Sequence, residues 1–359
     1  MTPRTAHRTG TAATTLRITS PAPRDLWEQA LASDPTALVF QSPAWVDCLR
    51  ASGRYRDASR LYELASGRRL VLPMARLGGA ADVLAVEASF PPGWGYGGVL
   101  ASGGARADDL AAVFADLSRR KVMRTSLHPN PLVNASWAEA RPRHALTVPR
   151  LAHVLNLDGG FARVWEQRFT GSARTAVRKA ERSGLTVECD TTGRHTAAFY
   201  ELFERSLDRW ARKQHEPRAL ARWRGHRRDP LCKLQLIAEH LGNRCRLWIA
   251  WRDGEPAAAI LVLQDANASY TRGAMDKELA GPTRANYLLH RLAIEQACDA
   301  GCRHYHMGES GGSASLAQFK TRFGARPVPY ADYHLERLPL TAADRHVRTA
   351  VKRVVGFRD

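Results

Sequence analysis

The chain has 359 residues, which is long enough for two domains of ordinary size or for one duplicated unit. Its 53 lysines and arginines outnumber its 35 aspartates and glutamates and give a formal net charge of +18, which favours an anionic partner such as nucleic acid, CoA phosphates or a membrane surface. No apolar run approaches the length of a membrane span, which argues against a membrane-spanning protein. The six cysteines form no set with zinc-binding spacing, which argues against a zinc centre and favours a reducing cytoplasm.

The sequence of the first half predicts an alternation of strands and helices. Residues 1–15 are basic and rich in threonine, without the apolar core of a signal peptide, and we expect a disordered tail. Strands are then predicted at 16–18, 59–65, 70–75, 125–128, 144–148 and 153–157, and helices at 25–32, 43–49 and 106–120. The segment 90–100 is too rich in glycine and proline for a central strand and predicts a loop along a cleft, with Trp94, Tyr96 and Gly97 as pocket residues. Core packing explains the two aromatic rings equally well.

The second half begins near residue 159 and shows a similar alternation. Helices are predicted at 161–168, 172–183, 196–213, 230–241 and 287–298, and strands at 185–189, 245–251, 257–263, 268–273 and 302–307. A glycine- and serine-rich loop, a short helix ending at Gly324 and a basic C-terminal helix at 341–359 complete the chain. This order predicts α/β layering, and the two halves are loosely similar although the sequence shows no strong internal repeat.

The stretch from Gly301 to Gly324 carries the clearest chemical signal. Phe319 and Phe323 are four residues apart on the predicted helix and would bury together, which holds Lys320 against an apolar wall beside the flexible loop. A lysine in that place is suited to stabilising negative charge on a reacting oxygen or a phosphate. The alternative is a solvated lysine behind two core phenylalanines.

Three further positions are candidates for the same site. Tyr270 and Arg272 face one side of a predicted strand, so Arg272 is placed to clamp a carboxylate or phosphate, although a surface cross-strand pair fits nearly as well. Glu309, at a strand end, is placed either to take a proton from an attacking amine or to cap the following turn. His304 and His306 form an H-x-H pair without a third ligand, so we predict no metal site.

Basic residues gather in one predicted helix and in a second stretch for which no helix is predicted. Arg174, Arg178 and Arg182 lie at i, i+4 and i+8, beside Lys179, and such a stripe can follow a phosphate backbone. The stretch 218–228 adds a stacking side chain to its charge, through Arg222, Trp223, Arg224 and Arg227. A solvated surface in a composition that prefers arginine is the alternative for both stretches.

Three motifs occur in one order along residues 35–335. The stretch Gly301–Gly324 contains G-x-x-x-Y-x-x-G followed by FKxxFG, the stretch 174–185 contains R-x-x-V-R-x-A-x-x-x-G, and residues 90–100 read FPPGWGYGGVL. Together they resemble the FemABX family of aminoacyl-tRNA-dependent peptidyltransferases and its GNAT-superfamily relatives. The resemblance implies an α/β fold of two tandem GNAT-like units with mixed β-sheets flanked by helices, at 16–158 on the acceptor side and at 159–340 on the acyl-donor side. No sustained heptads occur, so the coiled-coil arm of some family members is predicted to be absent.

The resemblance also implies an activity, namely transfer of an amino acid from aminoacyl-tRNA to the amine of a small acceptor. Lys320 would then steady the tetrahedral oxyanion, with Tyr305 and Phe319 beside the substrate, and aminoacyl-tRNA would be a co-substrate with no further cofactor. Family members that act on nucleotide-linked cell-wall precursors have a lysine after the early tryptophan. Here Val46 follows Trp45 and the first basic residue is Arg50, so an amine of a secondary metabolite, as in antibiotic biosynthesis, is at least as well supported as a peptide precursor.

An acyl-CoA-dependent GNAT enzyme is the competing hypothesis, and an RNA-binding protein without catalysis is a third. The segment 168–173 matches the R-x-x-G-x-A pattern that holds the CoA diphosphate, but a predicted helix precedes it where a strand is needed. At the expected strand–helix junction, 275–284, one glycine, one proline and two acidic residues make a poor diphosphate site. The sequence therefore argues against acetyl-CoA.

Overall fold

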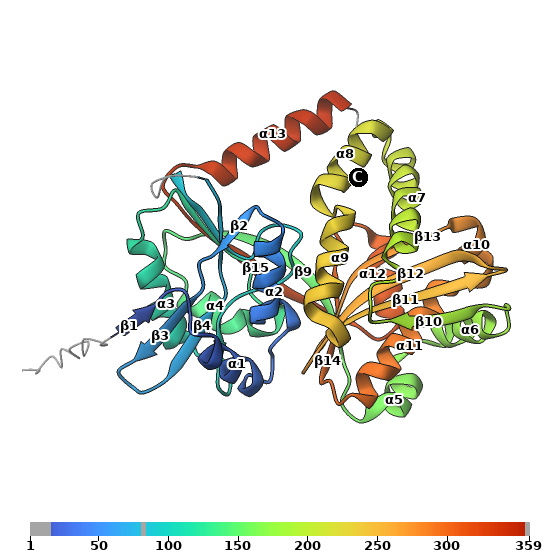
Figure 1. Cartoon of the computed structure of the whole chain (residues 1–359), viewed down its shortest axis with the longest axis horizontal. Coiled ribbons are helices and arrows are strands. Elements are labelled where there is room, and N and C mark those ends of the chain that lie inside the picture. The colour runs from blue at the N-terminus through green and yellow to red at the C-terminus, as the bar shows by residue number, and fades with distance from the viewer. Residues whose placement is uncertain (1–15, 80–83, 356–359) are drawn as a thin grey trace, which may run out of the picture.

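A sheet of 11 strands runs through both halves of the molecule (Figure 1). The structure is a computed structural model that describes residues 16–79 and 84–355, and the tail predicted at 1–15 lies outside the described residues. From edge to edge the order is β10 (Thr186–Asp190), β11 (Cys245–Arg252), β12 (Glu255–Gln264), β13 (Ala268–Met275), β14 (His304–Glu309), β9 (Leu146–Asn156), β15 (Arg326–Glu336), β8 (Arg124–Leu127), β6 (Val86–Ser89), β5 (Ala75–Leu77) and β2 (Tyr55–Asp57). The pairs β13–β14 and β6–β8 are parallel and the other pairs are antiparallel.

The first half adds a small sheet with helices on its two faces. Four strands follow the order β1 (Leu16–Thr19), β3 (Arg60–Leu64), β4 (Arg69–Leu72) and β7 (Leu100–Ala101), which confirms the strands predicted at 16–18, 59–65 and 70–75. The helices are α1 (Arg24–Ser33), α2 (Pro43–Ala51), α3 (Ala107–Arg119) and α4 (Asn134–Ala140), with short 3-10 turns at Val39–Gln41 and Pro131–Val133. Ser42 begins α2 by accepting a hydrogen bond from the backbone N–H of Trp45, as its N-cap position and the following proline predict.

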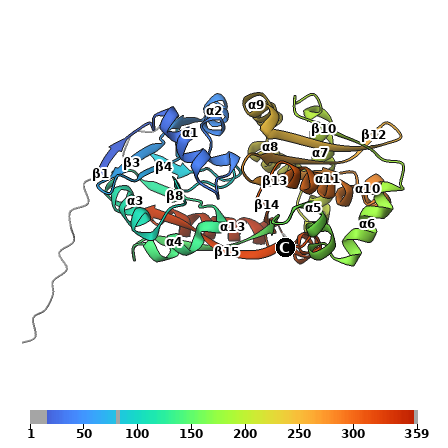
Figure 2. The same ribbon diagram turned by 90° about the horizontal axis from the view of Figure 1, so that it is seen from below.

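The second half places helices on both faces of its strands (Figure 2). They are α5 (Gly160–Arg163), a π-helical turn at Val164–Arg168, α6 (Gly171–Glu181), α7 (Thr196–Gln214), α8 (Arg218–Arg228), α9 (Leu231–Leu241), α10 (Lys277–Thr283), α11 (Ala285–Asp299) and α12 (Ala314–Arg322). Strand β12 alternates between two cores: Ala259, Leu261 and Leu263 pack with α7, whereas its intervening residues pack with α11. This burial on both faces explains its nearly continuous apolar sequence.

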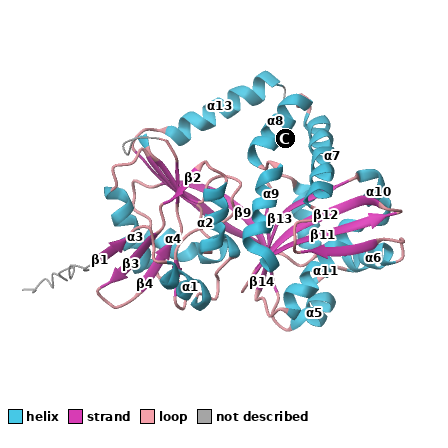
Figure 3. Ribbon diagram, in the orientation of Figure 1, coloured by secondary structure: helices cyan, strands magenta, loops and turns pink. Residues whose placement is uncertain are grey.

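Three elements differ from the sequence prediction. The strands predicted at 144–148 and 153–157 are one strand, β9, because residues 149–152 continue the ladder with β15. The basic stretch 218–228 is a regular helix, α8. Strand β15 was not predicted, and it crosses from the second half to pair with β8 of the first. One sheet therefore contains strands of both units, although the sequence predicts a boundary between the units at residue 158 (Figure 3).

The layered α/β architecture of two units, each with mixed strands and flanking helices, is confirmed. The longest helix of the described chain is α7, with 19 residues, so no long coiled-coil arm projects from this part of the fold. The predicted C-terminal helix is α13 (Leu340–Val355), and residues 356–359 lie outside the description. Across residues 16–79 and 84–355, every helix is too short or too polar to cross a bilayer.

The candidate site lies where two parallel strands, β13 and β14, separate. Strands β13 and β14 pair only at Ala268 with Tyr305 and at Ser269 with His306, and β14 then continues along β9. Beyond this point Tyr270, Arg272 and Glu309 lie on strands that no longer bond to each other. The two strands of the second half therefore separate next to β9, the strand through which the first half joins the sheet.

Candidate functional site

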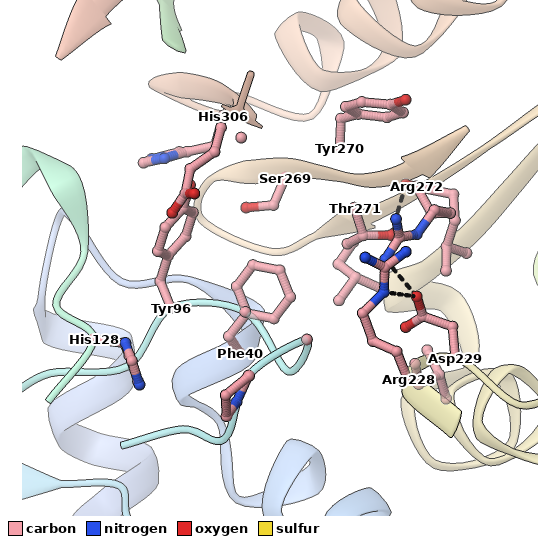
Figure 4. A pocket seen from close by; sticks show the side chains of 18 of the residues that line it. Phe40, Tyr96, His128, Arg228, Asp229, Ser269, Tyr270, Thr271, Arg272 and His306 are labelled. Carbon is pink, nitrogen blue, oxygen red and sulfur yellow. Dashed lines mark hydrogen bonds and ion pairs between the residues drawn. The ribbon is translucent and has the colours of Figure 1, made fainter. Parts of the chain in front are cut away.

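A cavity of about 430 Å³ lies between the two halves (Figure 4). The first half contributes the loop that follows β6, together with Phe40, His128 and Arg150. The second half contributes residues of α7, α9 and the two parting strands, and β15 supplies Tyr330 and Asp332. The cavity thus uses both units, as expected for a cleft in which two substrates meet.

Glycines shape the loop of residues 90–100. Gly95 has φ +80°, and a Cβ there would lie 2.4 Å from the ring of Phe40. A Cβ on Gly97 would lie 2.3 Å from the backbone oxygen of Ser89, so this position also requires glycine. The backbone oxygen of Trp94 accepts a hydrogen bond of 3.0 Å from the indole of Trp45. Trp94 and Gly97 therefore hold the loop in place, and Tyr96 lines the cavity.

One end of the cavity is acidic and rich in tyrosine. The hydroxyl of Tyr330 donates to a carboxylate oxygen of Glu309, and its ring packs edge-on against Tyr96 at 5.8 Å between centroids. Burial raises the pKa of both tyrosines, so their hydroxyls keep their protons and remain donors. Arg150 lies 4.0 Å from the second oxygen of Glu309, whose side chain stays 39% exposed. Glu309 is thus oriented but accessible.

A second carboxylate at this end, Asp332, is fully engaged. It accepts a hydrogen bond from Nε of Arg150 at 2.7 Å and faces Nδ1 of His128 at 3.0 Å. Burial opposes its ionisation, yet His128 and Arg150 hold the pKa of Asp332 below its usual value. Asp332 therefore fixes Arg150 and His128, and Glu309 is the carboxylate better placed to accept a proton.

The opposite end of the cavity is cationic, and Figure 4 shows it across from Tyr96 and His306. Asp229 forms ion pairs with Arg272 at 2.5 Å, with Lys233 at 2.8 Å and with Arg228 at 2.8 Å. Burial opposes the charge of Asp229, but these three cations lower its pKa to about 2. Burial in turn lowers the pKa of Lys233 and Arg272.

Two polar side chains on the cavity wall have no partner. The hydroxyl of Ser269 and both ring nitrogens of His306 are buried without a hydrogen bond, although these residues are register partners on β13 and β14. Burial lowers the pKa of His306 to about 3, so its ring is neutral at pH 7. Within the described residues no group of His, Cys, Asp and Glu side chains could hold a metal ion. The two groups are free to bond a bound substrate.

Lys320 lies behind the strand end that carries Glu309. Its side chain is buried, and Nζ donates to the backbone oxygens of Gly308 at 2.9 Å and of Glu309 at 2.6 Å. Burial lowers the pKa of Lys320 to about 8. The predicted pair of phenylalanines forms, with ring centroids 5.1 Å apart. Lys320 does not itself line the cavity; it contacts the backbone that does.

The structure brings only some of the predicted site residues together. Tyr96, Tyr270, Arg272 and Glu309 line one cavity. Tyr305 is fully buried in the core, and Phe319 packs against Tyr287 and His290 under α11, so neither reaches the cavity. Sequence reasoning missed cavity residues with little local signal: His128, Arg150, Asp229, Lys233, Ser269, Tyr330 and Asp332.

The predicted RNA-binding residues lie on two separate elements, α6 and α8, which are far apart in both views (Figures 1 and 2). On α6, Arg178, Lys179 and Arg182 are exposed, whereas Arg174 donates to the backbone oxygens of residues 165 and 166. On α8, Arg222 pairs with Asp208 and Arg224 pairs with Glu216. Trp223 is 58% exposed, and Arg227 lies 5.4 Å above its ring. The cations of α6 thus have fewer carboxylate partners within the protein than those of α8.

At the junction expected to bind a CoA diphosphate, a carboxylate already occupies two backbone N–H groups. Asp276 caps α10 by accepting hydrogen bonds from the backbone N–H groups of Glu278 at 2.8 Å and Leu279 at 3.3 Å, and it pairs with Arg205. At the other match, residues 168–173, a π-helical turn precedes the loop in place of a strand. Arg168 there donates to Asn156 and to the backbone oxygen of Asp158.

Comparison with known proteins identifies the fold. Residues 167–321 match a family described as an acetyltransferase (GNAT) domain, and the chain matches no curated protein. The solved structure of FemX gives a TM-score of 0.62 at 11% identity, covering 89% of this chain and 97% of FemX. A conserved protein of unknown function from Bacteroides thetaiotaomicron VPI-5482 gives 0.53 at 9% identity, covering 89% of this chain and 99% of that one. At such identities the similarity establishes the fold, and substrates must be argued from this chain's own residues.

Proposed function

From the FemABX-like GNAT fold of this chain, which is the fold of an acyltransferase, we propose that the protein transfers an amino acid from aminoacyl-tRNA to the amine of a small acceptor. The product is an amide, and the acceptor is a secondary metabolite or a peptide precursor. The proposal includes no cofactor beyond the aminoacyl-tRNA and places the reaction in the cytoplasm. Its support is the shared cavity, with an accessible carboxylate at one end.

The observation that carries the choice of donor is the cap of α10. In a GNAT enzyme that uses acyl-CoA, free backbone N–H groups at a strand–helix junction bind the diphosphate. Here the carboxylate of Asp276 already occupies the N–H groups of Glu278 and Leu279. A diphosphate would have to displace this carboxylate from the two N–H groups, whereas an ester on tRNA needs no such site.

The chemistry requires a neutral amine and a held ester. The amine nitrogen attacks the ester carbonyl, the new C–N bond forms, and the C–O bond to the terminal ribose breaks with a proton passing to the departing hydroxyl. Glu309, oriented by Tyr330 and open to the cavity, accepts the proton that the amine loses. Because an ester is already activated towards amines, positioning in the cavity supplies most of the acceleration.

Lys320 contributes through the backbone that carries this carboxylate and not through contact with the substrate. Two of its three N–H donors hold the backbone oxygens of Gly308 and Glu309, which fixes the end of β14. The oxyanion role predicted from the sequence would require the ammonium group to reach the cavity past these carbonyl groups. Its contribution to the proposed reaction is therefore to position Glu309.

An acyl-CoA donor is the second candidate, and the description of the matched domain as an acetyltransferase favours it. The two donors are separated by incubating the protein and a panel of amines with radiolabelled aminoacyl-tRNA or with acetyl-CoA. We expect label to appear in an amide only with the charged tRNA, and RNase treatment before the reaction should abolish it. Product from acetyl-CoA that resists RNase would replace the proposal by its alternative.

The same assay tests the proton acceptor. E309Q keeps the shape of the side chain and removes its basicity, so we expect turnover to fall at least about tenfold. E188Q is the matched control, because Glu188 lies on the far edge strand β10, outside the cavity, with its side chain 41% exposed and paired with Arg194 and His195. Wild-type turnover in E309Q would remove Glu309 from the mechanism.

A further inference from the structure

We infer that the acceptor carries an anionic group, a carboxylate or a phosphate, which Arg272 and Arg228 bind at the cationic end of the cavity while its amine meets Glu309 at the other end. This inference rests on the proposed function and names the substrate class that the same cavity accepts. It follows from the charge count, the free hydrogen-bond donors and the apolar wall between the two ends.

The charges at the cationic end do not balance. Asp229 is a single carboxylate among three cations, and Lys233 uses up one of its oxygens. The ammonium of Lys233 donates to Asp229, to Gly93 at 2.6 Å and to the backbone oxygen of Arg228 at 3.4 Å, so its three N–H groups are all occupied. Two guanidinium groups then share the remaining oxygen, which leaves two net positive charges here, with Arg272 26% exposed and Arg228 46% exposed. The cost of uncompensated charge falls on the more buried Arg272, whose pKa burial lowers, and a bound anion would offset it.

The arginines have donors left for that anion. Arg272 uses Nη2 for Asp229, and Arg228 uses Nε for the same oxygen. No other hydrogen bond from either guanidinium is made to the residues that the structure describes. Both side chains line the cavity, with exposures of 26% and 46%. A carboxylate or phosphate can therefore accept a forked pair of N–H groups from each.

The wall between the two ends is mostly apolar, with the hydroxyl of Ser269 as a polar group on it. Arg272 lies 5.9 Å from the centroid of Phe203, and Leu261, Leu263 and Phe40 continue the lining towards the opposite end. Tyr96 and His306 mark that end, and Figure 4 shows them across the cavity from Arg272 and Asp229. A substrate with an amine and an anion separated by a hydrocarbon segment matches this order of surfaces. An uncharged or purely cationic amine would leave the two arginines unpaired.

The test uses binding alone, so it needs neither tRNA nor turnover. Saturation-transfer NMR titrations of the full chain compare ε-aminocaproate, its neutral amide and aminohexyl phosphate, with γ-aminobutyrate and ω-aminooctanoate to vary the length. We expect at least one anionic member to bind about tenfold or more tightly than the amide. Tighter binding of the phosphate than of the caproate would assign the anion as a phosphate, and the reverse order would assign a carboxylate.

Variants connect this binding to the cluster. R272Q should lower the affinity for the anionic member about tenfold and leave the amide unaffected, and R228Q, at the more exposed of the two arginines, should do the same if R272Q does not fold. R222Q is the matched control, since Arg222 lies on α8 but pairs with Asp208 outside the cavity. Equal binding of amide and anion, no binding of any anionic member, or unchanged affinity in both folded variants would overturn the inference. Anion binding together with an RNase-resistant reaction would leave it standing while the proposed donor fails.

Discussion

Lys320 shows how a charge can be kept inside the fold. Its side chain is 1% exposed, yet two carbonyl oxygens at the end of β14 accept its N–H groups. Hydrogen bonds from an ammonium group are stronger than neutral ones and offset part of the cost of burial. Burial still lowers the pKa of this group to about 8, so the protonated form is penalised in the folded state. The residue links the stability of the protein to the position of Glu309.

K320M should therefore change both turnover and the pH dependence of stability. The pKa of Lys320 is about 8 in the folded protein and 10.5 in the unfolded chain, so the unfolded chain binds more protons between these values. The free energy of unfolding of the wild type, relative to K320M, should rise by up to about 3 kcal/mol as the pH increases from 8 to 10.5. Urea unfolding at several pH values measures it, and turnover should fall about tenfold.

The exposed Lys121 supplies the control, since K121M removes a solvated ammonium group outside the proposed RNA-binding surface. A stability difference between wild type and K320M that stays constant over this pH range would contradict the linkage. Full turnover in a folded K320M would show that the end of β14 holds its place without this lysine.

At the scale of an element, α6 is the more promising surface for RNA. Ala173, Val177 and Ala180 bury its inner face, which leaves Arg178 and its basic neighbours on the outer one. On α8 the carboxylates of Asp208 and Glu216 already neutralise two of the arginines. A charge that is free of a protein carboxylate releases more binding energy on a phosphate, because no ion pair must break first.

Substituting R178Q, K179Q and R182Q together should weaken binding to tRNA. Three phosphate contacts are lost, so the slope of the logarithm of affinity against the logarithm of salt concentration should become shallower by about two to three. Fluorescence anisotropy with labelled tRNA across a salt series measures this slope. R222Q should have a smaller effect, and an unchanged slope in the triple variant would point to a solvated surface without an RNA partner.

At the scale of the molecule, one sheet joins the two units. Strand β9 pairs with β14 on one side and with β15 on the other, and β15 continues the ladder to β8. Tyr333 on β15 packs in the core of the first half, where its ring centroid lies 5.8 Å from Phe114 and 6.0 Å from Trp137. Residues late in the chain thus complete the core of the first unit, and the cavity depends on both units being folded.

We expect the two units to unfold in one calorimetric transition for this reason. Y333A removes a buried ring and should lower the stability of the whole molecule by about 3 kcal/mol, shifting the single transition to lower temperature without dividing it. Differential scanning calorimetry of the wild type and the variant measures both properties. Two resolved transitions, with only the first moved by Y333A, would show that the units are independent.

The sequence by itself determined the elements and part of the site. Periodicity, caps and glycines act within a few residues, and they predicted most strands and helices, the buried pair of phenylalanines around Lys320, and the cavity residues Tyr96, Arg272 and Glu309. The tertiary structure alone decided which groups meet. Arg150 and Asp332 are separated by 182 positions yet form an ion pair, and β15, which supplies Asp332, is held by long-range pairing with β9 and β8. Local patterns carry no information about such partners, because their contacts form only when the sheet closes across both halves.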